Sequence, residues 1–140
     1  MEKDFKTQIQ IKFQHADLAG IMYFAHIFSF AHDCFEEFVQ AAGFSWASFF
    51  QNKENLIPIK QTECNFQKPF LAGKTYSVAV EVASFSTTSF VMRYVFKKDS
   101  DLHAVVKMVH TCLDPKTFKK IEIPGALKAK LEPFLKEENT

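Results

Sequence analysis

The sequence predicts an α+β domain in which a single antiparallel sheet packs against one long helix. Three features predict it: an alternating segment near the N-terminus, a long apolar segment with helical periodicity, and then four alternating segments separated by polar turns. The chain has 140 residues without an internal repeat or linker, so we expect one domain over residues 1–140. A sheet of this size can curl around a helix that is apolar on most sides.

The first two elements differ in their period. Residues 7–13 alternate with period two, as in a half-buried strand whose less polar positions are Thr7, Ile9, Ile11 and Phe13. From Ala25 to Ala42 apolar side chains fill most of a helical projection, so other parts of the protein must cover this helix. Gly43 fits its C-cap, and residues 46–50 fit a short amphipathic helical turn. The narrow polar stripe of the long helix consists of His26, Ser29, Asp33, Glu36, Glu37 and Gln40.

The second half reads as strands joined by turns. We expect extended segments at 57–66, 75–84, 89–97 and 103–113, with turns at 68–74, 98–101 and 114–117. In the second of these segments one face is apolar, formed by Tyr76, Val78, Val80 and Val82. The packing positions expected in the first are Ile57, Ile59 and residues 64–66. Residues 124–136 predict a short terminal helix that Pro133 kinks or ends.

Composition excludes several classes of function. The net charge is +1, from 17 basic and 16 acidic residues, so neither nucleic acid nor an acidic membrane surface is an expected partner. No stretch approaches the roughly 18 apolar residues of a membrane span, and the N-terminus lacks the apolar core of a signal peptide. Cys34, Cys64 and Cys112 are odd in number and widely spaced, which indicates buried thiols in a reducing cytoplasm.

The segment before the long helix carries the groups of an acyl-transfer site. Asp17 supplies a carboxylate that can act as nucleophile or base, and it lies several residues before the helix, too far for an ordinary N-cap. The helix start supplies unpaired N–H groups and partial positive charge for a developing oxyanion. Gly20 has no side chain, so a ligand can approach the backbone there. Together these groups suit the cleavage of an activated acyl group.

The run Asp17-Leu-Ala-Gly-Ile-Met-Tyr-Phe24 resembles the signature of the 4-hydroxybenzoyl-CoA thioesterase family of hotdog proteins. Residues 23–33 are also similar to the helix start in bacterial dihydroxynaphthoyl-CoA thioesterases, and the likeness extends from about residue 8 to residue 124. It implies a hotdog fold and hydrolysis of an acyl-CoA by a homodimer or homotetramer without metal or cofactor, at a site between two subunits. In this site Asp17 is the catalytic carboxylate and the backbone N–H near Phe24 the oxyanion donor. The implied substrate-binding residues are Gly20, Ile21, Met22, Tyr23 and Ser89.

Two positions depart from that family. The stretch 86–88 is Ser-Thr-Thr, where relatives carry a basic cluster that holds the phosphates of coenzyme A. Either another lysine binds the phosphates, or the nucleotide is held weakly, or the acyl group arrives on an acyl carrier protein. The lysines considered are Lys60, Lys68, Lys74, Lys97 and Lys98. Phe24 also replaces the Tyr or His that relatives often have, so only its backbone can serve the site.

Other functions stay open at this point. A non-catalytic acyl-binding module is one, and hydratase chemistry, for which no matching His with an acidic partner is evident, is another. His32 and Glu36 have the i, i+4 spacing of metal ligands but lack a third, and His15 and His26 read as polar surface or cap residues. Cys34 falls on the buried helical face and is expected to be an inert thiol. The acyl group is expected to be aromatic, with short or medium aliphatic chains as the alternative.

Overall fold

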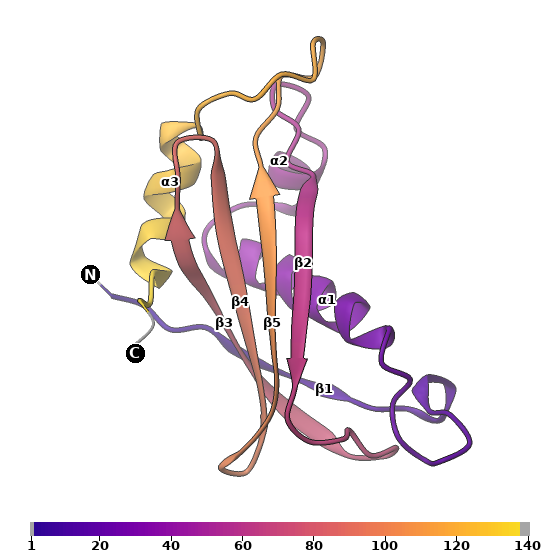
Figure 1. The fold of residues 1–140 in the computed structure, drawn as a ribbon. Coiled ribbons are helices and arrows are strands. Elements are labelled where there is room, and N and C mark those ends of the chain that lie inside the picture. Colours follow the sequence, from indigo (N-terminus) through magenta and orange to yellow (C-terminus); the bar gives the residue numbers. More distant parts are fainter. Residues whose placement is uncertain (1, 138–140) are drawn as a thin grey trace.

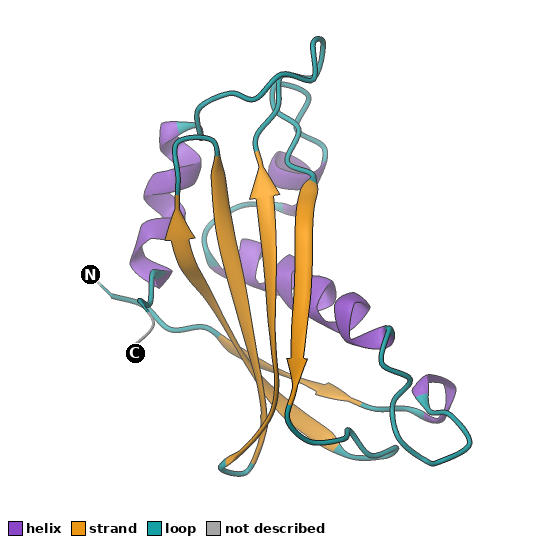
Figure 2. Ribbon diagram, viewed as in Figure 1, coloured by secondary structure: helices purple, strands orange, loops and turns teal. Residues whose placement is uncertain are grey.

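The structure, a computed structural model, describes residues 2–137, which form one antiparallel sheet with a long helix lying across one of its faces (Figure 1; Figure 2). The strand order is β1-β3-β4-β5-β2, so β1 and β2 are the two edges. The α+β class predicted from the sequence is confirmed. The strands are β1 (Lys6–Gln10), β2 (Ile59–Phe66), β3 (Thr75–Phe85), β4 (Ser89–Lys98) and β5 (Asp101–Thr111). The helices are α1 (His26–Ala41), α2 (Trp46–Phe50) and α3 (Gly125–Leu131), with 3-10 turns η1 (Phe13–His15) and η2 (Glu132–Phe134).

The core lies between α1 and the inner face of the sheet. On β3 every second residue is buried, which confirms the alternating pattern read from the sequence. The neighbouring β4 adds four side chains with no exposed surface, which are two phenylalanines, a tyrosine and a methionine. The buried side chains of these two strands are Tyr76, Val78, Val80, Val82, Phe90, Met92, Tyr94 and Phe96.

Helix α1 begins and ends close to the predicted limits. It buries seven side chains between Ile27 and Val39 and leaves Ser29, Asp33 and Glu37 exposed on its polar stripe. The helix stops because Gly43 adopts a φ of +107°, a conformation that glycine enters without steric cost. The Phe44 N–H then returns to the carbonyl of Val39, 3.1 Å away. Gly43 thus ends the helix as expected, although the C-cap itself is Ala42, and the short helix at residues 46–50 is confirmed.

The first strand is shorter than predicted, and the placement of Phe13 on it was wrong. Strand β1 ends at Gln10, and Phe13 lies in η1 with 94% of its surface exposed. The chain leaves the sheet because the Lys12 N–H bonds to Nδ1 of His15 at 2.9 Å instead of to a neighbouring strand. Ile9 and Ile11 are buried, as the alternation indicated.

Strand β2 is an edge strand with little burial, so part of its expected packing was wrong. Ile59 and Phe66 are each 41% exposed, and only Cys64 is half-buried. The physical reason is topology: β2 pairs with β5 on one side, and no strand of residues 2–137 pairs with its other side. An unpaired edge invites pairing with another chain.

The C-terminal segment packs beside β3, in the half of the sheet that lies away from the β2 edge (Figure 1). Phe134 meets Phe38 of α1 edge-on with ring centroids 4.8 Å apart, and the Lys136 N–H bonds to the carbonyl of Val82 at 2.9 Å. Pro133 ends the α-helical part at η2, as expected from its missing N–H. None of the helices in residues 2–137 has the length and apolarity needed to span a membrane.

Candidate active site

The Asp17 segment is a tight turn closed by its own backbone. The Gly20 N–H bonds to the Asp17 carbonyl at 3.0 Å, and the Asp17 N–H bonds to the Ile21 carbonyl at 2.9 Å. The exposed carboxylate of Asp17 accepts the Ala19 N–H through Oδ1 at 2.8 Å. Gly20 has a φ of +79°, a conformation that glycine adopts without steric cost. Close packing does not explain the glycine, because an added Cβ would meet no atom within 4 Å. The turn therefore fixes the carboxylate and leaves it accessible.

The same turn is anchored on the connection between β2 and β3. The Met22 N–H bonds to the Phe70 carbonyl at 2.8 Å, and the Ala72 N–H bonds to the Gly20 carbonyl at 3.0 Å. Ile21 and Leu71 also form an isolated antiparallel bridge. The position of Asp17 thus depends on two segments that are about 50 residues apart in the chain.

Helix α1 starts beside this turn with unpaired donors. No side chain caps the helix at Ala25. Within residues 2–137 the N–H groups of Phe24 and Ala25 have no hydrogen-bond acceptor, whereas the next N–H, that of His26, bonds to the Tyr23 carbonyl at 3.1 Å. Such orphan N–H groups carry the positive end of the helix dipole. A carbonyl oxygen that gains negative charge can be stabilised there.

An apolar pocket of about 310 Å³ opens next to the helix start. Its walls include Ile21, Met22 and Phe24 on one side, and Phe66 and Phe70 on the other. Lys68 lies at the same pocket and forms an ion pair with Asp101, with Nζ and Oδ2 3.3 Å apart. Aromatic walls of this kind suit a flat apolar group.

Most of the predicted site residues therefore meet in one place. Asp17 and Gly20 belong to one turn, and Tyr23, which is 52% exposed, and Phe24 lie between this turn and the start of α1. Met22 is almost fully buried, so its side chain serves the core as well as the pocket wall.

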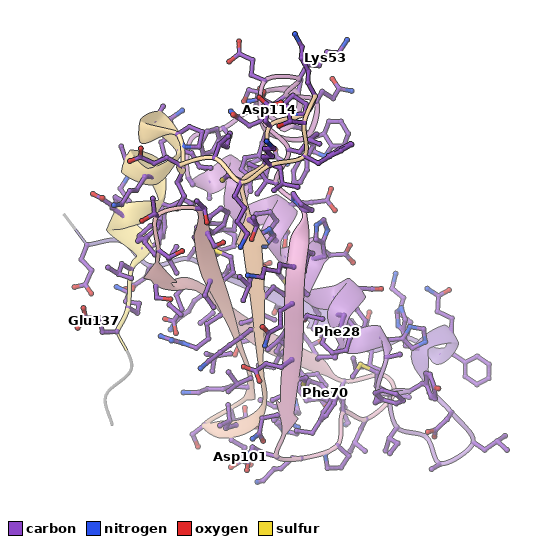
Figure 3. All side chains as sticks on the ribbon, turned by 45° about the horizontal axis from the view of Figure 1, so that its top comes forward. Phe28, Lys53, Phe70, Asp101, Asp114 and Glu137 are labelled. Atoms are coloured by element: carbon purple, nitrogen blue, oxygen red, sulfur yellow. The ribbon has the colours of Figure 1, made fainter. Side chains whose placement is uncertain are left out.

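Ser89 is the exception. It is the first residue of β4, and its Oγ lies 2.8 Å from Oγ1 of Thr111, the last residue of β5. This is the end of the sheet opposite to the Asp17 turn (Figure 1). The same separation is visible in Figure 3, where Asp114 marks one end and Phe70 the other. Within a single chain Ser89 and Asp17 do not meet.

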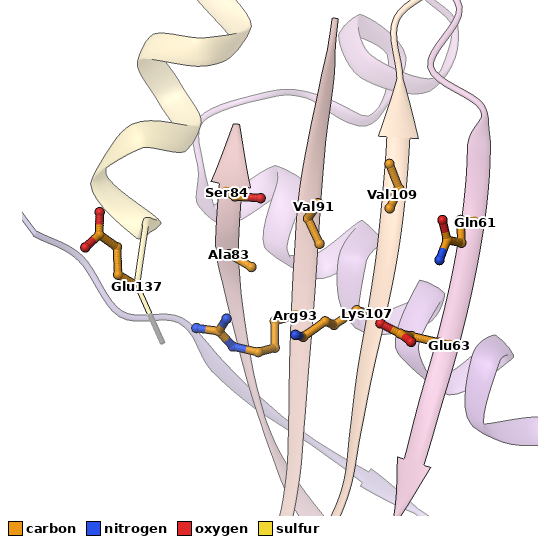
Figure 4. Close-up of a pocket in the computed structure, with 9 residues that line it drawn as sticks. All are labelled: Gln61, Glu63, Ala83, Ser84, Val91, Arg93, Lys107, Val109 and Glu137. Atoms are coloured by element: carbon orange, nitrogen blue, oxygen red, sulfur yellow. The ribbon is translucent and has the colours of Figure 1, made fainter. Parts of the chain in front are cut away.

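A second, larger groove of about 500 Å³ lies on the face of the sheet away from α1 (Figure 4). It runs across β2, β5, β4 and β3, and its central Arg93 bonds through Nε to Oε1 of Glu81 at 2.7 Å and also donates to the Lys136 carbonyl. Arg93 is thus already engaged, and the Asp17 turn takes no part in this groove. Size alone does not make this groove the reactive site.

The other candidate groups are held in structural roles. Cys34 is buried in the core, and burial raises the pKa of its thiol to about 12, so it is not a thiolate at neutral pH. His32 Nδ1 lies 3.6 Å from Oε2 of Glu36 as a surface pair. In the described part of the chain no three His, Cys, Asp or Glu side chains gather in a way that could hold a metal ion.

His15 makes the cap contact that was one of its two readings from the sequence, but its part in supporting the site was not predicted. Its Nδ1 accepts the Lys12 N–H, its carbonyl accepts the Tyr23 N–H at 2.9 Å, and its ring packs edge-on against Phe30 with centroids 4.7 Å apart. Burial, followed by the nearby His26, lowers the pKa of His15, which favours the neutral ring that the Lys12 bond requires. The only sequence signal was its three-residue spacing from Lys12, which is too common to be informative.

Comparison with known proteins gives a consistent result. Residues 11–131 match the thioesterase-like superfamily. The chain is 31% identical over 112 residues to the 1,4-dihydroxy-2-naphthoyl-CoA hydrolase of Microcystis aeruginosa, covering 80% of this chain and 81% of the relative. It is 28% identical to the enzyme of the same name from Thermosynechococcus vestitus, covering 89% and 86%. Among solved structures, the 1,4-dihydroxy-2-naphthoyl-CoA thioesterase of Synechocystis superposes with a TM-score of 0.83 at 20% identity, covering 92% of this chain and 96% of that one. The arrangement of sheet and helix is therefore the hotdog fold.

Proposed function

Given that this chain belongs to the thioesterase-like superfamily and is an acyl-CoA thioester hydrolase, we propose that Asp17 and the start of α1 carry out the reaction. The observation that carries this proposal is the hydrogen-bonded turn that presents the Asp17 carboxylate beside the unpaired N–H groups of Phe24 and Ala25. These are the two kinds of group that thioester cleavage requires, a nucleophile or base and an oxyanion donor.

In the proposed reaction the thioester carbonyl oxygen accepts hydrogen bonds from the N–H groups at the helix start. Negative charge that develops on this oxygen is stabilised by the helix dipole. The Asp17 carboxylate either attacks the carbonyl carbon, forming a mixed anhydride that water then cleaves, or it activates a water for direct attack. A single turnover in isotope-labelled water distinguishes the routes, because only hydrolysis of the anhydride carries label into the Asp17 carboxylate.

We propose an aromatic acyl group as the preferred substrate. The pocket beside the helix start is lined by Phe24, Phe66 and Phe70, whose rings can stack on a flat acyl group. The relatives that are named as 1,4-dihydroxy-2-naphthoyl-CoA hydrolases act on such a group, which supports this choice.

We further propose that the working form is a homodimer, or a homotetramer built from such dimers, joined through β2. Its open edge is apolar at Ile59 and Phe66, and pairing with the same strand of a second copy satisfies it. If the two β2 strands run antiparallel, the Asp17 end of one subunit lies beside the Ser89 end of the other. This pairing is the arrangement in which Ser89 can contribute to the pocket.

The cytoplasm is the proposed compartment, because Cys34, Cys64 and Cys112 are all free thiols, as in a reducing environment.

A panel of thioesters with detection of the released thiol tests this function. We expect aromatic acyl-CoA substrates to give the highest kcat/KM, with short and medium aliphatic acyl-CoA substrates slower. Aliphatic substrates that react faster than aromatic ones would contradict the proposed acyl preference. Release of thiol from acyl carrier protein thioesters but not from coenzyme A esters would assign a carrier protein as the donor. No release from any thioester would contradict the proposed function.

A further inference from the structure

Two hydroxyl side chains form a pair where β4 begins and β5 ends. Ser89 and Thr111 lie directly opposite each other in the pairing of these strands, and Oγ of Ser89 is 2.8 Å from Oγ1 of Thr111. Ser89 is half-buried, whereas Thr111 is only 4% exposed. Within residues 2–137 neither hydroxyl has another hydrogen-bond partner.

The backbone holds both members of the pair in place. The Ser89 N–H donates to Oγ of Ser86 at 3.1 Å, and the Ser89 carbonyl accepts the Ser86 N–H at 2.8 Å. On the other side the Thr111 N–H donates to the carbonyl of Pro58 at 3.0 Å. What remains to be decided is the direction of the two hydroxyl protons.

The number of protons indicates which hydroxyl donates. Each hydroxyl has one proton, so the bond between them uses one proton and leaves the other without a partner. If Ser89 donated, the remaining proton would belong to Thr111, which is buried and has no other acceptor in the described residues. A buried polar hydrogen without an acceptor is costly. Thr111 therefore donates to Ser89, and the Ser89 O–H stays available for an acceptor outside the chain.

The open edge of β2 determines which part of a second copy comes close to this pair. The Gln67 N–H donates to the His103 carbonyl on β5, so every second residue of β2 directs its backbone groups to β5. The residues between them, Thr62, Cys64 and Phe66, direct theirs to the open edge. A two-fold axis perpendicular to the sheet keeps each face on its own side, so residues placed opposite each other must share a face. The axis therefore passes through a residue of the strand.

The two central positions of β2 are Thr62 and Glu63. An axis at Glu63 would place two like charges directly opposite each other, which is unfavourable. An axis at Thr62 instead places Gln61 opposite the partner's Glu63, where an amide can donate to a carboxylate. In this arrangement the Phe66 end of one strand lies beside the Pro58 end of the other.

This pairing brings the hydroxyl pair of one subunit towards the pocket of the other. Phe66 forms a wall of the pocket beside the Asp17 turn, and it lies next to the partner's Pro58, whose carbonyl is bonded to Thr111. Thr111 is then two strand spacings and Ser89 three spacings from the neighbouring β2, about 10 and 14 Å. Both distances are shorter than an aromatic acyl group joined to pantetheine.

We propose that Ser89 donates a hydrogen bond to an oxygen of the acyl-CoA bound at the partner's Asp17 turn, and that Thr111 is the positioning residue that directs this donor. The inference rests on the proposed function and on the β2 dimer. Thr111 itself does not touch the substrate, because its proton is used on Ser89. The thioester carbonyl is bonded at the helix start, so the acceptor is another oxygen of the substrate. The bond then supports binding more than chemistry.

Steady-state kinetics of four variants test this role. Ser89→Ala should raise KM for an aromatic acyl-CoA roughly threefold to tenfold, the range for one net hydrogen bond, with kcat nearly unchanged. Thr111→Val keeps the shape of the side chain but removes its proton, and it should raise KM to the same extent. Thr111→Ser, which keeps the hydroxyl, should behave as wild type. Thr7→Val, which removes the hydroxyl bonded to Glu37 beside β1, is the matched control.

A double variant separates positioning from packing. Because both residues act through one hydrogen bond to the substrate, Ser89→Ala/Thr111→Val should raise KM no further than either single change does. A Thr111→Val protein that is less stable but has the KM of wild type would show a structural role only, and it would overturn the inference. Effects on KM that multiply in the double variant would also overturn it.

Cross-linking tests the pairing without turnover. In a Cys64→Ala background, Thr62→Cys should form a disulfide-linked dimer under mild oxidation, because the two Cα atoms at position 62 are expected about 5.5 Å apart. Glu63→Cys should not, and a dimer linked through position 63, or a monomer, would overturn the inference. If wild type cleaves acyl-CoA while the Ser89 and Thr111 variants match the control, the inference is wrong and the proposed function stands. Failure of wild type to cleave any thioester would instead contradict the proposed function.

Discussion

The backbone N–H of Tyr23 donates a 2.9 Å hydrogen bond to the carbonyl oxygen of His15. This bond joins Tyr23, three residues before α1 begins, to the segment that precedes Asp17, so the turn and the helix start are held as one unit. His15 also fixes the approach to the turn through its ring, since Nδ1 accepts the Lys12 N–H. The position of the carboxylate relative to the helix N–H groups therefore depends on a neutral imidazole.

His15→Phe should retain the packing against Phe30 but lose the acceptor at Nδ1. We expect kcat to fall roughly tenfold, because small displacements of a catalytic group are costly. Protonation of His15 has a similar effect in wild type. Since its pKa lies below the ordinary 6.5, the bond persists at neutral pH and is lost as the pH falls through the lowered value. A pH profile of kcat with the same acid limb in wild type and His15→Phe would argue against this role.

His110 predicts an acid-sensitive stability. Its ring is sandwiched between Phe35 and Phe90, neither ring nitrogen has a hydrogen-bond partner in the described residues, and burial lowers its pKa from 6.5 to about 4. The fold favours the neutral ring. The free energy of unfolding is therefore highest above pH 6.5 and declines as the pH falls towards 4. The loss is on the order of 3 kcal/mol. His110→Phe should remove most of this dependence in denaturant titrations between these pH values, and an unchanged pH dependence would contradict the assignment.

The alternating and helical periods of the sequence predict the core well, because they depend on local geometry alone. Tyr76 and Val82 are buried as their alternation indicated, and α1 lies within one residue of its predicted limits. The mistakes arise where tertiary topology decides. Phe13 continues an alternating pattern, yet the chain has already left the sheet. Phe66 is apolar, yet its strand is an edge.

The candidate site was likewise predictable where it depends on neighbouring residues, and not where it depends on tertiary topology. The Asp17 turn and the helix start are adjacent in sequence, so their juxtaposition was predictable from about ten residues. Ser89 could be matched by resemblance, but only the topology reveals that it lies at the opposite end of its own chain. The lysines first considered for phosphate binding included Lys68, which the fold pairs with Asp101.

Cys34 tests the alternative of a thiol nucleophile. Because burial raises its pKa to about 12, we expect native protein to react very slowly with iodoacetamide at this position. Cys34→Ala should leave kcat unchanged and lower the free energy of unfolding by about 1 kcal/mol through lost packing. Loss of turnover in a folded Cys34→Ala protein would instead make the thiol part of the chemistry.

A mixing experiment tests whether each site draws on two subunits. Asp17→Asn and Ser89→Ala proteins are unfolded together and refolded, so that hybrid dimers form. If Asp17 of one subunit and Ser89 of its partner belong to the same site, one site of each hybrid carries both changes and the other carries neither. Sites with wild-type KM and kcat should then appear, although neither parent has them. Activity equal to the average of the parents would contradict a shared site.

The central claim is that the Asp17 carboxylate performs the chemistry, and Asp17→Asn tests it most directly. Asparagine keeps the shape of the side chain and can still accept the Ala19 N–H, so the turn should fold as before. Asp33→Asn, which changes an exposed carboxylate on α1, is the matched control. With an aromatic acyl-CoA we expect Asp17→Asn to lower kcat by roughly a hundredfold or more, while the control stays near wild type. Near wild-type turnover in a folded Asp17→Asn protein would contradict the account.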